Sequence, residues 1–158
     1  MQENYLLPAS FKKWGWSIFV SSAILGIFPL FYNWEPAFLE LDVLAIFIDD
    51  LIENKAIIGM TNNNILNEIC AVLVIIGGLM VAFSKEKYED EFIASIRLKS
   101  LVWSTYLNYG ILLLALILVY DFSFMWVLIF NMFTILLFFI ILFHWNLVKL
   151  KKSVDYAE

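Results

Sequence analysis

The sequence is poor in the residues that most catalytic and metal sites require. Its 158 residues include one histidine and one cysteine, so an intrachain disulfide is impossible and a metal site with several His and Cys ligands is excluded. The sequence patterns of P-loop, dinucleotide, zinc-protease, serine-hydrolase and dithiol sites are also missing. These absences favour a non-catalytic protein without a cofactor. They leave a membrane enzyme unsupported, but they do not exclude one.

Charge is scarce as well, because charged residues make up 16% of the chain and hydrophobic residues 63%. Soluble domains are only about 45–50% apolar, and a chain of this size cannot bury so large an excess. We therefore expect the lipid bilayer to be the main partner of a single domain, residues 1–158. The net charge of −5 argues against direct nucleic-acid binding.

Four segments have the length and apolar character of a membrane-spanning helix, which needs about 20 residues to cross about 30 Å of hydrocarbon. They lie at about residues 14–33, 65–84, 101–120 and 123–143. Only Asp121 and Phe122 separate the last two, which predicts a tight helical hairpin. The predicted fold is all-α, a polytopic membrane protein with a four-transmembrane-helix bundle.

The basic residues predict the orientation of these spans. Nine of the ten lie on one side of the predicted membrane, and only Lys55 lies on the other. The nine are Lys12, Lys13, Lys85, Lys87, Arg97, Lys99, Lys149, Lys151 and Lys152. The positive-inside rule then predicts a protein of the cytoplasmic (inner) membrane with both termini in the cytoplasm.

Two longer segments do not span. Residues 35–61 fall outside and are acidic; over residues 38–53 a helical pattern puts Asp42, Asp49 and Glu53 on one stripe. This pattern predicts an amphipathic helix lying along the outer surface. Residues 85–100 fall in the cytoplasm and contain no Gly or Pro, which predicts a cytoplasmic helical segment.

Four polar residues in or near the predicted spans are candidate site residues: Asn108, Asn131, Thr134 and Glu68. The functional interpretation is a polar lining for a small ligand or ion. The alternative is structural, because amides and hydroxyls also hydrogen-bond neighbouring helices in lipid and Glu68 suits a helix N-terminus. The spacing about the turn puts Asn108 level with Thr134, and we favour the structural interpretation.

Small residues predict one close helix contact. Ser21 and Ser22 in the first span lie at the same depth as Gly77 and Gly78 in the second. Small side chains let two backbones approach closely, so the two pairs are expected to pack against each other.

The segment from Phe83 to Ile93 and several later residues resemble a family of small, uncharacterised four-helix membrane proteins of Bacteroidota-type bacteria. The later residues are Ile96-Arg97-Leu98, Ser100-Leu101, Trp103, Asn108-Tyr109 and Phe130-Asn131-Met132-Phe133. The resemblance covers most of the chain and implies no assigned activity. It implies genes placed beside small helix-turn-helix regulators, and hence a role in signalling.

Three hypotheses for function follow. The first is a non-catalytic sensing or partner-docking module that uses the cytoplasmic segment, with Glu89, Asp90, Glu91 and Arg97 as candidate docking residues. The second is a small oligomeric transporter or channel lined by Asn108, Asn131 and Thr134. The third, a lipid-modifying membrane enzyme, has the least support because no catalytic set is present.

Overall fold

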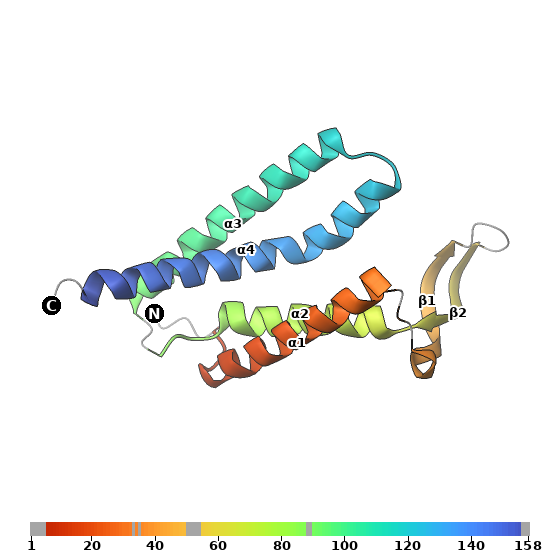
Figure 1. The fold of residues 1–158 in the computed structure, drawn as a ribbon, viewed down its shortest axis with the longest axis horizontal. Helices are drawn as coiled ribbons and strands as arrows, with labels where there is room; N and C mark the ends of the chain where they lie inside the picture. Colours follow the sequence, from red (N-terminus) through yellow and green to blue (C-terminus); the bar gives the residue numbers. More distant parts are fainter. Residues whose placement is uncertain (1–5, 33, 35, 50–54, 88–89, 156–158) are drawn as a thin grey trace. The chain divides into compact units, whose positions relative to one another are not determined.

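The computed structural model describes residues 6–32, 34, 36–49, 55–87 and 90–155. Its elements follow in the order α1 (Ser10–Tyr32), η1 (Ala37–Leu39), β1 (Glu40–Asp49), β2 (Lys55–Asn64), α2 (Leu66–Phe83), α3 (Glu91–Leu118) and α4 (Phe122–Asp155) (Figure 1). The fold is thus mostly helical, as predicted. Three stretches of it, Leu66–Phe83, Glu91–Leu118 and Phe122–Leu150, are long and apolar enough to cross a membrane.

The chain forms two compact units. The first combines the chain up to Phe19 with the chain from Val74 onward, and the second is Val20–Leu73. The first unit therefore holds the start of α1, the end of α2, and the whole of α3 and α4.

The core of the first unit is small and aromatic. Phe139 stacks on Phe83 and on Phe143, with ring centroids 5.6 and 5.8 Å apart. The buried apolar residues of this core are Phe19, Val81, Ala82, Phe139, Ile140, Phe143 and Leu147. Most other apolar side chains of α3 and α4 are exposed, which is the surface expected of helices that face lipid and not water.

Helices α1 and α2 approach most closely at two glycines of the first unit. A Cβ atom added at Gly77 would lie 2.7 Å from the backbone nitrogen of Phe19 and 3.1 Å from the carbonyl oxygen of Gly15. A Cβ atom at Gly15 would in turn lie 3.0 Å from the carbonyl oxygen of Gly77. Gly77 does mark a close helix contact, but the atoms nearest to it belong to Gly15 and Phe19, not to the predicted Ser21 or Ser22. The atoms nearest to a Cβ at Gly78 belong to Leu136 and Phe19.

Helices α3 and α4 form the predicted antiparallel hairpin, drawn in green-cyan and blue (Figure 1). Helix α3 begins after Asp90, whose carboxylate accepts a hydrogen bond of 2.8 Å from the backbone of Ile93, an N-cap of the usual kind. Between the helices Asp121 takes a φ of 57°. This left-handed conformation is one that Asp tolerates better than most residues.

The second unit contains a β-hairpin where the sequence predicted an outer amphipathic helix. Strands β1 and β2 pair antiparallel from Glu40 opposite Asn64 to Asp49 opposite Lys55. The base of the hairpin is closed by the backbone of Ile65, which donates to the Leu39 carbonyl at 3.1 Å, and by the Asn64 amide, which donates to the Pro36 carbonyl at 2.9 Å.

The helix prediction for residues 38–53 is therefore wrong over Glu40–Asp49, while residues 50–53 lie outside the described residues. The reason for the error is visible in the composition. The segment is rich in β-branched residues, which fit a pleated strand better than a helix, and residues 55–64 supply a partner strand of the same length. A strand places successive side chains on alternate faces, so Glu40–Asp49 does not form the helical stripe that the sequence predicted, and Glu53 of that stripe lies outside the described residues.

The predicted cytoplasmic helical segment, residues 85–100, is helical only in part. Helix α2 ends at Phe83 and α3 begins at Glu91, and the described residues between them, 84–87 and 90, are not helical. Backbone pairing explains the break. Leu7 donates to the Phe83 carbonyl and accepts from the Lys85 N–H, both at 2.9 Å, which draws the chain away from the helix after Phe83.

Candidate functional site

Arg97 of α3 contacts both the residue after α2 and a ring of α4 in the first unit. Its side chain is 8% exposed. The guanidinium donates to the carbonyl oxygen of Ser84 at 3.3 Å and lies 5.1 Å from the centre of the Phe143 ring. The negative end of the helix dipole stabilises a cation beside the last carbonyl groups of a helix. An aromatic ring beneath the cation adds a cation–π attraction.

Two other carbonyl groups at the end of α2 accept hydrogen bonds from nearby groups. The Ser84 hydroxyl donates to the Met80 carbonyl, and the Leu7 N–H donates to the Phe83 carbonyl. Helix ends need such partners because their last carbonyls have none within the helix. Lys12 of α1 also forms an ion pair with Glu86, just beyond this end. Arg97 is thus one part of a fixed junction, which we call the α2 junction.

A row of buried polar residues follows Arg97 along α3 toward its C-terminus. Ser100, Ser104 and Asn108 follow at intervals of four and are all buried, so they share one helix face. On α4, the Asn131 side-chain amide donates to Oδ1 of the Asn108 side chain at 3.1 Å, and the Asn146 side-chain amide donates to the Ser100 hydroxyl at 3.0 Å. These residues form a polar seam between α3 and α4.

The seam brings together two of the four polar candidates and leaves out the others. Asn108 lies opposite Asn131, one turn of α4 from the predicted Thr134. The Thr134 hydroxyl donates to the carbonyl of Phe130 in its own helix at 2.8 Å. Glu68 lies in the second unit, in the first turn of α2, and accepts from the Asn63 amide at 2.7 Å. Glu68 is exposed, so it is placed as a helix-terminal carboxylate.

The seam predicts that Asn108 contributes to stability. Asn108→Leu should lower the free energy of unfolding by about 0.6–2 kcal/mol, because it removes an interhelical hydrogen bond shielded from water. Unfolding of the purified protein in detergent measures this. Thr134→Val is the matched control and should change the free energy by less than about 0.5 kcal/mol. If the Asn108 and Asn131 variants were fully additive in a double-mutant cycle, the bond would have no energetic role.

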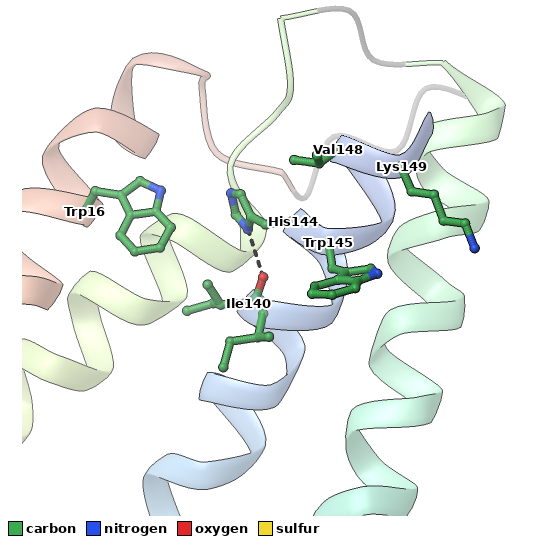
Figure 2. A pocket seen from close by; sticks show the side chains of 7 residues that line it. Trp16, Ile140, His144, Trp145, Val148 and Lys149 are labelled. Atoms are coloured by element: carbon green, nitrogen blue, oxygen red, sulfur yellow. Dashed lines mark hydrogen bonds between the residues drawn. The ribbon is translucent and has the colours of Figure 1, made fainter. Parts of the chain in front are cut away.

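An aromatic groove lies beside the second half of α4, near the α2 junction. Its volume is about 720 Å³ and its lining residues are Trp16, Ile140, Ile141, His144, Trp145, Val148 and Lys149. Figure 2 shows Trp16 of α1 opposite His144, with Trp145 on the next side of α4. His144 Nδ1 lies 2.8 Å from the Ile140 carbonyl oxygen, so this nitrogen carries a proton and donates. The histidine is held in place by its own helix.

The candidate docking residues fall into two groups. Asp90 and Glu91 are exposed at the start of α3, whereas Arg97 is buried in the α2 junction, so its guanidinium does not belong to a docking surface. Glu89 lies outside the described residues. The exposed side chains that follow on α3 include two apolar ones, Phe92 and Leu98, and the basic Lys99.

Sequence reasoning missed the α2 junction and the pairing of Ser100 with Asn146. The spacing of Arg97, Ser100, Ser104 and Asn108 was a usable signal, because these residues lie on one helix face. No sequence signal pointed to Leu7 as the partner of the Phe83 and Lys85 backbone.

Among the residues that the structure describes, three helices are long and apolar enough to cross a membrane, and polar side chains join α3 to α4 and to the end of α2. Within the part of the chain that the structure describes, no group of three or more His, Cys, Asp and Glu residues is placed to hold a metal ion. Comparisons with protein-family models, with curated proteins and with solved structures found no match.

Proposed function

We propose that the chain is a non-catalytic integral membrane protein that docks a partner on its cytoplasmic side, as part of a sensing or signalling pathway. The first half of the proposal is four spans with both termini inside. The stretch of α1 after Lys13 contains no charged residue and is long enough to be the fourth span. The basic residues near both chain ends and between α2 and α3 support the orientation.

The observation that carries the docking half is an exposed, mixed surface at the start of α3, which we call the α3 docking face: Glu91, Phe92, Ser95, Leu98 and Lys99. Phe92 and Leu98 are 56% and 63% exposed, and charged residues flank them. In the proposed topology these side chains lie in the cytoplasm and face water. Exposed apolar side chains within a polar rim are typical of protein-binding surfaces.

The α2 junction gives this face a fixed support. Arg97 lies on the opposite side of the same helical turns and binds the end of α2. The docking face is thereby attached to the bundle, so a change in how the spans pack would be transmitted to it. The alternative of a transporter lined by Asn108 and Asn131 has less support, because these amides bind each other.

Site-specific photo-crosslinking tests the docking proposal. A photoreactive amino acid replaces Leu98 in one variant and Leu114 in another; their exposures, 63% and 61%, are matched, but Leu114 lies deep in the predicted span. We expect a protein adduct of one defined mass at Leu98 in the native host and none at Leu114. Lipid adducts alone at both positions would overturn the proposal.

A further inference from the structure

One surface of the second unit is not explained by a cytoplasmic docking role. Four apolar side chains lie on one face of the hairpin, in two cross-strand pairs, Leu44 opposite Met60 and Ile46 opposite Ile58. All four are about two-thirds exposed, between 64% and 67%. We call this the hairpin face. A two-stranded sheet is marginally stable by itself and usually packs its apolar face against a second layer.

Acidic and amide residues extend the same face toward the base of the hairpin. Glu40 and Asp42 precede Leu44 by four and two positions along β1, and because every second residue of a strand lies on the same face, they point to the same side as Leu44. They lie opposite Asn64 and Asn62, and the Asn62 amide donates to the Asp42 carboxylate at 3.2 Å. Glu40 and Asp42 are exposed. The face thus consists of an apolar half next to a half with two carboxylates and no basic residue.

This charge pattern decides between possible occupants. A second copy of the hairpin would bring two more carboxylates and no cation, so either like charges would meet or carboxylates would be buried against apolar side chains without a partner. An anionic lipid surface would repel the carboxylates. A segment with apolar side chains followed by Lys or Arg would satisfy both halves at once.

We propose that the hairpin face binds a cationic amphipathic helix of a polypeptide. The apolar stripe of the helix covers Leu44, Ile46, Ile58 and Met60, and its basic residues lie against Glu40 and Asp42. A helix packed on a sheet is a regular two-layer arrangement, and a narrow stripe of four side chains fits one helix. The proposal rests on the proposed topology for one point only, that the partner reaches the protein from outside the cytoplasm.

Binding is measured with the full-length protein in nanodiscs of zwitterionic lipid. The probe is a fluorescent 14-residue amphipathic helix made of Leu and Lys, and the comparison peptide carries Glu at every Lys position. Empty nanodiscs give the binding to lipid alone. We expect the Lys peptide to bind the protein at least about tenfold more tightly than it binds empty discs, and the Glu peptide to show no such preference.

Two sets of variants locate the site. The double variant Leu44→Thr/Ile58→Thr removes apolar area but keeps strand-forming residues, and it should weaken binding about tenfold or more. Leu41→Thr is the matched control, because Leu41 lies on the opposite face of the hairpin, and it should leave binding within about twofold. Glu40→Lys/Asp42→Lys should reverse the preference, so that the Glu peptide binds better.

The proposal is overturned if the Lys and Glu peptides bind equally, or if Leu44→Thr/Ile58→Thr binds the Lys peptide like the unmodified protein. It is also overturned if the protein self-associates and the same double variant makes it monomeric, because a second copy would then be the occupant. Both sides of a nanodisc are accessible, so an incorrect topology would leave the binding result unchanged and would be detected only by labelling in cells.

Discussion

Gly77→Ala should lower the free energy of unfolding by about 1–3 kcal/mol, although alanine is normally the better helix former by about 0.5–1 kcal/mol. The added methyl carbon would lie 2.7 Å from the Phe19 nitrogen and 2.9 Å from its Cα atom. Both are backbone atoms and cannot move aside by a rotamer change, so α1 and α2 must separate. Thermal or denaturant unfolding in detergent measures the loss.

Gly110→Ala is the matched control, since it makes the same substitution in α3 where a new Cβ atom would meet nothing within 4 Å. We expect it to be neutral or stabilising, as helix propensity alone predicts. Equal melting temperatures for the two variants would show that the helices do not approach closely at Gly77.

Arg97→Met should lower the free energy of unfolding by about 2–3 kcal/mol, because it leaves the buried Ser84 carbonyl without this donor and removes the contact with the Phe143 ring. Methionine keeps most of the aliphatic volume, so the loss reports the guanidinium and not a cavity. The free energy of unfolding in detergent is again the measured quantity, and the photo-crosslink at Leu98 should weaken with it.

The neighbouring Lys99→Met provides the control, because Lys99 is exposed on the same helix and exposed charges contribute less than about 1 kcal/mol. Arg97→Lys should retain only part of the stability, since an ammonium has no planar fork to bind a carbonyl while stacking on a ring. If Arg97→Met and Lys99→Met were equally stable, Arg97 would have no special role in the α2 junction.

The sequence was sufficient to predict the helices that follow Ile65. Runs of about 20 apolar residues with few charges are typical of membrane-spanning helices, so α2, α3 and α4 could be placed. The short turn at Asp121 identified α3 and α4 as a hairpin. Pairing of Asn108 with its neighbouring helix was also predictable. The partner was wrong by one turn, because the depth of a residue in a helical hairpin depends on how the turn is built.

The hairpin of residues 40–64 was missed because a short amphipathic segment fits a helical and a strand pattern equally well when only one strand is considered. The acidic residues Asp42 and Asp49 then suggested a helical stripe. The decisive information lies in the second strand, Lys55–Asn64, which pairs with β1 along its length. Long-range pairing of this kind, like that of Leu7 with Phe83 and Lys85, is not encoded in local periodicity.

Cysteine labelling in intact cells tests the topology on which the functional proposal depends. Cys70→Ser removes the native thiol, and single cysteines then replace Lys87 in one protein and Thr61 in another; both positions are exposed. With a membrane-impermeant maleimide, Thr61→Cys should be labelled from outside, and Lys87→Cys only after the membrane is opened. Labelling of Lys87→Cys in intact cells would contradict the account, since the α3 docking face would then lie outside the cytoplasm.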